Sequence, residues 1–567
     1  MWGSSACPVR EEERVRGTRA DVGVRPTMLE TNNMRYAFLV LTIAAAHGQD
    51  LSGARIRAHV KFLASDLLEG RGVGTRGGEL ATEYIASQLA LAGAKPAGDN
   101  GTYFQRVALA GIEPLADSKL EASSKGRVAA FRWLDDFVGN TLEQKTLDEF
   151  DVETVFVGHG ITAPEFKWDD YSGIDVKGKI VVLFTNEPPS NDPKFFGGKS
   201  LTYYGRWSYK YEQALRKGAL GCIIVHTGGT AGYGWDVVRN SWSKEDPQVK
   251  LAPGQHDLAI AGWLSREAGE RLFGLAGKTV DEMLKAADKR GFKASALNVR
   301  LRGGIKVKVR SIETANVAAV IPGSDPQLKN EAVIFSAHWD HLGIGFPVNG
   351  DHIYNGAMDN ATGCGIMLEI ARAWGSLSQK PRRSALFLAL TAEESGLRGS
   401  EYYVAHPIFA PGKTALGLNF DTFYPYGRTN DVVVDGAERT TAYPQVEEAA
   451  RRYRLRIKPD SHPEQGHFYR SDHFSFARVG IPAFTIKMGS DFAAKPAGYG
   501  EKLYEEYHSK QYHQPSDEYK DSWDMSGMEQ MAQFGYTLGL NAADTEKMPT
   551  WKKGDEFLGA REKSGVR

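Results

Sequence analysis

The amino-acid sequence predicts an α/β sandwich, in which helices cover both faces of a sheet. From about Lys306 onward, short apolar runs alternate with helical stretches, and the runs are continuous rather than alternately polar. Continuous apolar strands between helices are typical of a sheet buried on both faces. The predicted strands are 332–337, 384–390, 416–420 and 481–486, and the predicted helices lie near 362–375, 397–405, 443–455 and 525–541.

Two amphipathic helices are predicted before this sandwich, at Leu51–Leu68 and Gly78–Ala92. The residues between them, Gly72–Gly77, match the letters G-x-G-x-x-G. The segment before this match is helical in character, whereas a dinucleotide-binding loop follows a strand, so we interpret it as a glycine-rich connection.

A region with a different pattern follows from about Asp151 to Val299, where short apolar runs are broken by Gly, Pro and Asp. This pattern predicts a β-rich unit with few long helices. Within it, Phe195–Trp235 is rich in Gly, Tyr and Trp, and we interpret it as an exposed loop and partner surface, with core packing as the alternative. Residues past about 546 are polar and predict a loose tail.

Composition and charge exclude several classes of protein. Of 567 residues, 42% are hydrophobic and 25% charged, which fits neither a disordered chain nor a protein with many membrane spans. The net charge is −1, so we expect no nucleic-acid partner. The three cysteines, Cys7, Cys222 and Cys364, lie far apart, so any metal is expected on His and carboxylate ligands.

The run Tyr36–Ala46 has eleven residues, which is too few to cross a bilayer, and it follows Met34-Arg35. It predicts a signal peptide that begins at Met34, and therefore a secreted or periplasmic protein with no stable membrane insertion after signal cleavage. A retained anchor or a buried N-terminal helix is the alternative.

Residues of metal-binding type stand directly after the predicted strands. Three of these strands end in His338-Trp-Asp340, Glu393-Glu394 and Asp421, respectively. Such residues taken singly are usually caps or surface groups, but the carboxyl ends of strands in an open α/β sheet meet at one edge. The candidate ligands, with two others from turns, are His338, Asp359, Glu394, Asp421 and His513.

Two histidines and three carboxylates suit Zn²⁺ or a similar divalent ion, and they exceed what one tetrahedral zinc with an open position requires. Two metals that share one carboxylate would use all five. Neighbouring side chains leaving a strand point in opposite directions, so we expect only one of Glu393 and Glu394 to bind metal. The other would act as a general base; two solvated glutamates in a helix first turn are the alternative.

Five ordered blocks resemble the co-catalytic zinc exopeptidase family that contains bacterial leucyl aminopeptidases and glutamate carboxypeptidase. The resemblance covers roughly 50–115 and 305–545, and it implies a three-layer sandwich with a mixed, mostly parallel sheet. The region between them resembles a protease-associated domain. The blocks are His338-x-Asp340, Asn355-Gly-Ala-x-Asp359-Asn-Ala-Thr-Gly363, Ala392-Glu-Glu-Ser-Gly-Leu-Arg-Gly-Ser400, Asp421 and His513-x-Pro-x-Asp517.

The resemblance implies two Zn²⁺ ions per chain, with His338 and Asp421 on one, Glu394 and His513 on the other, and Asp359 between them.

It also implies roles for neighbouring residues. Glu393 becomes the general base, and Asp340 is expected to orient the His338 ring. Arg470 is a candidate substrate contact, with a structural ion pair as the alternative. Met358 stands where the family often has a polar residue and is expected to alter the polarity of the cleft wall.

The predicted organisation is a leader and signal peptide (1–48), an N-terminal part of the peptidase domain (49–130), an inserted protease-associated domain (131–303), a zinc peptidase catalytic domain (304–545) and a tail (546–567). We expect a secreted zinc-dependent aminopeptidase acting on peptides. The alternatives are a carboxypeptidase, a glutaminyl-cyclase-like acyltransferase with a single zinc, and a non-catalytic binding ectodomain. The sequence does not indicate side-chain preference or oligomeric state.

Overall fold

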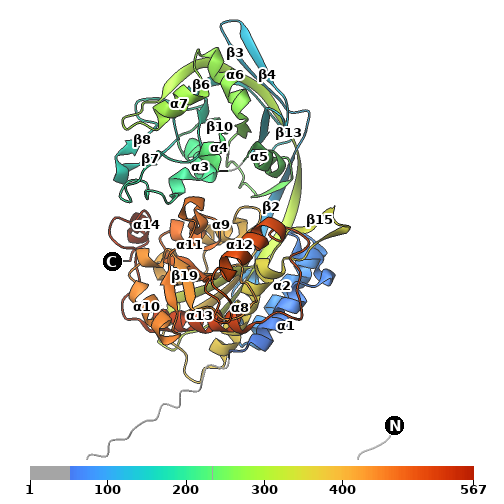
Figure 1. Ribbon diagram of the computed structural model, residues 1–567, viewed down its shortest axis with the longest axis vertical. Helices are drawn as coiled ribbons and strands as arrows, with labels where there is room; N and C mark the ends of the chain where they lie inside the picture. Colours follow the sequence, from blue (N-terminus) through green and yellow to red (C-terminus); the bar gives the residue numbers. More distant parts are fainter. Residues whose placement is uncertain (1–50, 233, 567) are drawn as a thin grey trace, which may run out of the picture. The chain divides into compact units, whose positions relative to one another are not determined.

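The computed structural model describes residues 51–232 and 234–566, so the predicted signal segment lies outside the described residues. A long strand, β13 (Ser295–Ile321), takes part in both large groups of strands (Figure 1). Its first part pairs with β3 and β6, and its second part pairs with β2 and β17.

The strands after β13 build the sheet that carries the candidate residues. Its centre is parallel, in the order β17, β14, β18, β21. Antiparallel strands flank it, with β13 beside β17 and β19 beside β21, which confirms an α/β fold with a mixed sheet. The bounds are β1 Lys95–Pro96, β2 Phe104–Pro114, β11 Asp246–Val249, β14 Ala332–His338, β17 Ser384–Leu390, β18 Thr414–Phe420, β19 Asp431–Asp435, β20 Arg456–Lys458 and β21 Ala483–Met488.

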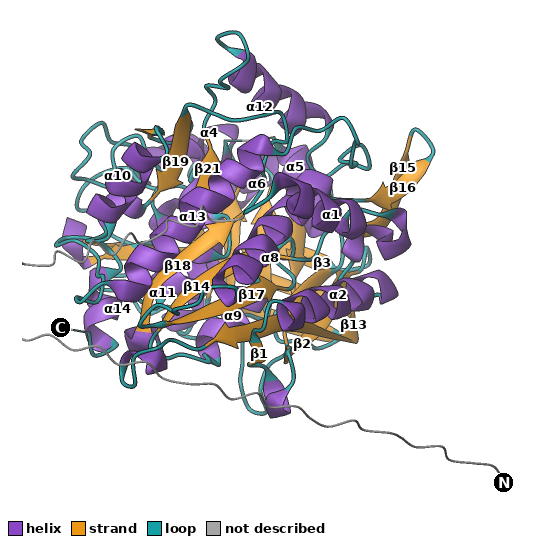
Figure 2. Cartoon of the chain, turned by 90° about the horizontal axis from the view of Figure 1, so that it is seen from below, coloured by secondary structure: helices purple, strands orange, loops and turns teal. Residues whose placement is uncertain are grey.

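Helices cover both faces of this sheet, as the continuous apolar strands require. Val333 and Phe335 of β14 pack into the core formed with α1, α2, α8, α10 and α13, whereas Ile334 packs on the opposite side with residues of α9 and α11. Helices α8 and α13 lie across the strands β14 and β18 in Figure 2. The bounds are α1 Gly53–Leu63, α2 Arg76–Leu91, α8 Thr362–Gly375, α9 Arg398–Ala405, α10 Tyr443–Arg452, α11 His473–Arg478, α12 Tyr499–Lys510 and α13 Ser526–Asp544.

The predicted elements of this part are confirmed with small shifts at their ends. The helix predicted to run to Leu68 ends at Leu63, and the Ser65 side chain then caps a 3₁₀ turn over Asp66–Arg71. The strand predicted from Ile481 begins at Ala483, because Pro482 has no N–H to donate to the sheet.

The region predicted as an insert (131–303, hereafter the insert region) forms a second sheet together with β3 and β4, which precede it in the chain, and with β13, which extends beyond it. The strand order there is β4, β3, β13, β6, β9, β10, β12, β5. Their bounds are β3 Lys119–Ser124, β4 Arg127–Phe131, β5 Phe137–Asn140, β6 Leu147–Phe156, β9 Ile180–Leu183, β10 Gly221–Val225 and β12 Ile260–Leu264. The helices are α3 Trp207–Arg216, α4 Gly228–Ala231, α5 Trp235–Trp242, α6 Arg266–Leu275 and α7 Val280–Ala287, and a short pair is β7 Thr162–Ala163 with β8 Trp168–Asp169. Outside the insert region, after β14, β15 Gly343–Val348 pairs with β16 Asp351–Tyr354.

Two expectations about exposed segments are wrong. The stretch Phe195–Trp235 contains helix α3, and its Phe196, Tyr203 and Tyr209 are buried in an aromatic cluster. Trp551 and Phe557 of the supposed loose tail belong to the same cluster, and α14 (Leu558–Lys563) follows them. Aromatic side chains bury large areas, and here they supply a core rather than a partner surface.

Among the described residues, no helix combines the length and the hydropathy that a membrane crossing requires.

Candidate metal centre

The candidate residues lie at the carboxyl ends of three neighbouring parallel strands. His338 is the last residue of β14, Asp421 follows β18 directly, and Glu393-Glu394 follow β17 after two residues. Asp359 lies in the irregular turn that leads into α8, and His513 lies beyond α12. The fold therefore brings together residues from five separate places in the chain.

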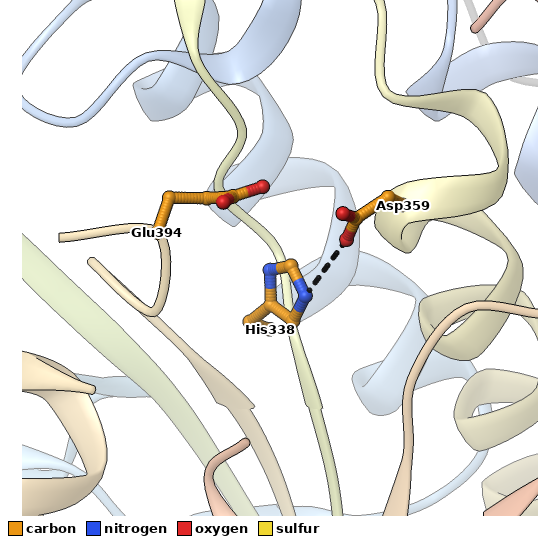
Figure 3. Close-up of side chains that lie close together, drawn as sticks. All are labelled: His338, Asp359 and Glu394. Atoms are coloured by element: carbon orange, nitrogen blue, oxygen red, sulfur yellow. Dashed lines mark ion pairs between the residues drawn. The ribbon is translucent and has the colours of Figure 1, made fainter. Parts of the chain in front are cut away.

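Asp359 lies between two histidines. Its Oδ1 is 3.2 Å from His338 Nε2, and its Oδ2 is 3.5 Å from His513 Nε2. Each imidazole has a second carboxylate: Asp421 Oδ1 is 3.3 Å from His338 Nε2, and Glu394 Oε2 is 2.9 Å from His513 Nε2. Figure 3 shows the carboxylates of Asp359 and Glu394 beside the His338 ring.

These distances fit a divalent metal bound by nitrogen and oxygen. Two ligands of one tetrahedral zinc, each about 2.0–2.1 Å from the ion, lie about 3.3 Å apart. Two overlapping groups of three could hold an ion: His338, Asp359 and Glu394, and His338, Glu393 and Asp421. The donor set contains only imidazoles and carboxylates, which suits zinc.

The adjacent glutamates differ in their electrostatics. Burial raises the pKa of the Glu393 carboxyl well above its usual range, and nearby carboxylates add to the effect. Burial also acts to raise the pKa of Glu394, but the imidazoles of His513 and His341 outweigh it and lower that pKa to about 2. Two neighbouring carboxyls with opposite shifts are suited to different tasks, one to hold a proton and one to stay ionised.

Asp340 orients its neighbours differently from the expectation. Its backbone carbonyl, not its carboxylate, lies closer to the His338 ring, at 3.1 Å from Nδ1, against 4.0 Å for the carboxylate. The carboxylate instead accepts hydrogen bonds from the backbone N–H groups of Glu393 and Glu394, at 3.1 and 3.4 Å. Burial raises the Asp340 pKa to about 7. The expected contact from carboxylate to ring is thus replaced by one from the carbonyl.

The turn that carries Asp359 is held from two sides. The Asp517 carboxylate accepts hydrogen bonds from the backbone N–H groups of Met358 and Asp359, at 2.9 and 3.1 Å. Asn360 donates from Nδ2 to the carbonyl of Phe420, next to Asp421. Asn360 also accepts from Gly363 N–H at 2.9 Å, so it combines a contact at the start of α8 with a tie to β18.

Arg470 and Met358 lie outside the ligand set, and the structure bears differently on their predicted roles. Arg470 is exposed and forms no ion pair within the described part of the chain, so the structural alternative proposed for it finds no support there. Met358 is 2% exposed, as buried as the neighbouring candidate ligands His338 and Asp359, so its effect on the polarity of the cleft wall stays a prediction.

Three residues of the site were not assigned from the sequence. His341 Nδ1 lies 2.6 Å from Glu394 Oε1, and Ser471 Oγ donates to Asp421 Oδ2 at 2.6 Å. The buried Arg71 guanidinium donates to the carbonyls of Trp339, Asn355 and Gly356. The signal for His341 was its place three residues after His338, whereas Ser471 and Arg71 carry no signal in local sequence.

The comparisons with known proteins bear on this geometry. Residues 316–536 match the model of peptidase family M28. The M28 region contains every candidate ligand, and the match confirms both the predicted resemblance to zinc exopeptidases and the prediction of an enzyme of this kind.

Two curated relatives match parts of the chain. It is 27% identical over 255 residues to leupeptin-inactivating enzyme 1 of Streptomyces exfoliatus, which covers 44% of this chain and 52% of that protein. It is 33% identical over 129 residues to a probable leucine aminopeptidase 2 of Aspergillus oryzae, covering 23% of each. The chain thus spans about half the length of the first relative and less of the second.

Solved structures of similar proteins include an aminopeptidase from Aneurinibacillus sp. strain AM-1, with a TM-score of 0.47 and 18% identity over 88% of this chain and 95% of that one. A zinc aminopeptidase from Bacillus subtilis has a TM-score of 0.40 and 17% identity over 90% of this chain and 99% of that one.

Proposed function

We propose that this protein is a secreted, zinc-dependent aminopeptidase that removes N-terminal residues from peptides. One observation carries the proposal: Asp359 lies within 3.5 Å of two imidazoles, His338 and His513, each of which has its own second carboxylate. This arrangement suits two metal ions that share one carboxylate. A metal pair supplies Lewis-acid polarisation of the scissile carbonyl and a more acidic water.

In this proposal the ligands divide into two sets. His338 and Asp421 would hold one zinc ion, Glu394 and His513 would hold the other, and Asp359 would be shared between them. The pKa of Asp359 is strongly lowered, because the two nearby imidazoles outweigh the effect of burial, and this supports a carboxylate that stays ionised.

Glu393 is the proposed general base. It lies with His338 and Asp421 in one close group, and its raised pKa suits a carboxyl that takes up a proton during the reaction. Its carboxylate would accept the proton of the attacking water and then donate it to the leaving amine. Asp340 supports this step through the backbone of Glu393, because its carboxylate holds that N–H.

The name of one relative supports the amino-terminal assignment, since it is called a probable leucine aminopeptidase. We also propose that the insert region is a protease-associated domain, that the peptidase domain comprises 49–130 and 304–545, and that a signal peptide begins at Met34. N-terminal sequencing of the secreted protein tests the last point.

The function is tested by measuring hydrolysis of leucyl anilide and of its N-acetylated form, with and without a zinc chelator. We expect cleavage of the free-amine substrate alone, loss of activity with the chelator, recovery on zinc addition, and two zinc ions per chain by elemental analysis. Cleavage of carboxyl-terminal residues would indicate a carboxypeptidase instead. A single zinc with cyclisation of glutaminyl peptides would favour the acyltransferase.

A further inference from the structure

His341 is a buried histidine beside the proposed zinc ligands. It is 2% exposed, and its Nδ1 lies 2.6 Å from Glu394 Oε1. The other oxygen of the same carboxylate, Oε2, faces His513 Nε2 at 2.9 Å. The two oxygens of Glu394 therefore face two different imidazoles.

The His341 ring is fixed from several directions. Its backbone N–H donates to the Arg71 carbonyl at 3.3 Å. Gly356 packs directly on the ring, since a Cβ at that position would lie 2.4 Å from His341 Cγ. The ring meets that of His513 edge-on, with centroids 5.7 Å apart. This packing leaves the ring little freedom to turn away from Glu394.

Only one nitrogen of this ring makes a polar contact. Nε2 is buried and has no hydrogen-bond partner among the residues that the structure describes. A carboxylate can only accept, so the tautomer with hydrogen on Nδ1 is the one that bonds to Glu394. The contact is therefore a directed N–H donation to Oε1.

The carboxylate of Asp421, which like that of Glu394 is proposed to bind one zinc ion, is held in a comparable way by a different donor. Asp421 Oδ2 accepts from Ser471 Oγ at 2.6 Å, and Ser471 Oγ in turn accepts from Asn419 Nδ2 at 2.8 Å. The oxygen of Asp421 that faces His338 is Oδ1, at 3.3 Å. In both cases one oxygen is engaged by a protein donor and the other faces an imidazole of the site.

We propose that His341 is a positioning residue that engages Glu394 Oε1, so that Oε2 alone is presented to the zinc ion beside His513. This inference rests on the proposed zinc peptidase function. Partners of this kind fix a ligand's orientation and typically change metal affinity by about 10–100-fold when they are removed. His341 is thus expected to set the affinity of one of the two zinc ions.

Three variants of the full chain test the inference: His341→Asn, His341→Gln and His341→Leu. The amide nitrogen of Asn can occupy the place of Nδ1, whereas that of Gln reaches the place of Nε2. Zinc content is measured by elemental analysis during competition with a graded series of chelator concentrations. The control is His406→Leu, the same change at an exposed histidine outside the site.

We expect His341→Leu to bind one zinc ion like the wild type and the other about 10–100-fold more weakly. His341→Asn should stay within a few-fold of the wild type, and His341→Gln should resemble Leu. At limiting zinc, kcat for leucyl anilide should fall in the Leu variant with little change in KM, and excess zinc should restore it.

The inference is overturned if His341→Leu retains both zinc ions at wild-type affinity, or if Gln rescues binding and Asn does not. Should the Leu variant fail to fold, as circular dichroism would show, the order of Asn and Gln still decides. Failure of the proposed function would be seen in the wild type alone, as absence of two zinc ions or of free-amine-dependent cleavage. If the wild type has two zinc ions and this cleavage, and the His341→Leu variant is unaffected, only the inference about His341 is overturned.

Discussion

Two clusters of buried or half-buried ionisable groups, both within the described residues, differ in how their charges are balanced. One, here the insert cluster, is formed by Asp170, Glu187 and Lys210. The other, here the site cluster, is formed by the proposed zinc ligands and the general base: His338, Asp359, Glu393, Glu394, Asp421 and His513. Both are built from residues that rarely lie buried unless they are paired.

The insert cluster satisfies its own groups. Lys210 donates from Nζ to the carbonyls of Asn186 and Tyr204, at 2.8 and 2.6 Å. Asp170 accepts from the Ile161 N–H and the Trp168 indole, and Glu187 accepts from the N–H and hydroxyl of Thr202. One cation and two carboxylates are thus surrounded by hydrogen-bond donors and acceptors of the protein, which indicates a structural role.

The site cluster is not balanced by the protein itself. Its four carboxylates face three imidazoles, those of His338 and His513 and that of His341 beside Glu394. Each oxygen of Asp359 has a ring nitrogen as a neighbour. Buried anions in excess of cations are costly unless a cation is bound. Charge balance, rather than burial, therefore separates the structural insert cluster from the site cluster, which is suited to hold metal.

The largest expected effect comes from Glu393→Gln, which tests the proposed general base of the site cluster. The amide keeps the shape of the side chain but cannot accept a proton, so kcat should fall by about 10²–10⁴-fold while both zinc ions are retained. Steady-state kinetics on leucyl anilide and elemental analysis measure the two quantities.

The matched control is Glu313→Gln at an exposed position, which should leave kcat unchanged. If Glu393→Gln lost zinc instead of turnover, Glu393 would be a ligand, as its place in a possible metal-binding group allows.

A smaller effect is expected from Lys210→Met, which tests the insert cluster. Removal of this fully buried cation leaves the Asn186 and Tyr204 carbonyls without their donor and takes a positive charge from the surroundings of Asp170 and Glu187, so it should lower the free energy of unfolding by about 3 kcal/mol. Thermal unfolding measures the loss, with the exposed Lys194→Met as control. Zinc content and kcat should match the wild type, and a loss of either would contradict the structural assignment.

An effect that is absent at neutral pH and develops only in acid concerns His473, a buried histidine with no counter-charge among the described residues. Burial lowers its pKa to about 3, and its Nδ1 lies 2.7 Å from Thr485 Oγ1. Because the fold holds the neutral ring, protons favour the unfolded chain, in which the pKa is about 6.5. The stability that this ring contributes is full above that pH and is lost as pH falls from about 6.5 toward 3, by about 1.4 kcal/mol per pH unit.

His473→Asn keeps a donor near Thr485 but does not titrate. Its unfolding free energy, measured by denaturant between pH 4.5 and 7, should therefore depend less steeply on pH than that of the wild type. The exposed His406→Asn should follow the wild-type curve. Parallel curves for the His473 variant and the wild type would show that this ring is not held neutral.

Much of the fold could be predicted because strong local patterns agree with the tertiary structure. Strand β17 covers the same residues as its apolar run, and β14 extends one residue beyond its run, to His338. The aromatic segment Phe195–Trp235 was interpreted wrongly, because Gly and Tyr occur in loops and in cores alike, and only the contact with Trp551 and Phe557 separates the two. The same contact explains the error about the tail.

The types of residue at the site could be predicted from the sequence, but the contacts between them could not. The sequence indicated that His338, Glu393-Glu394 and Asp421 end neighbouring strands, since strand ends are visible as the ends of apolar runs. It did not indicate that the Asp340 carbonyl, rather than its carboxylate, faces the His338 ring. That choice depends on side-chain rotation within a few ångströms.

The sequence by itself determined the alternation of strands and helices and the chemical type of each residue at the sheet edge, because both are properties of short segments. The tertiary structure decided that Asp359 lies between two imidazoles more than 170 positions apart, and that His341 rather than solvent meets Glu394. Contacts between distant segments depend on how the helices and the sheet pack as a whole, and no local pattern encodes that packing.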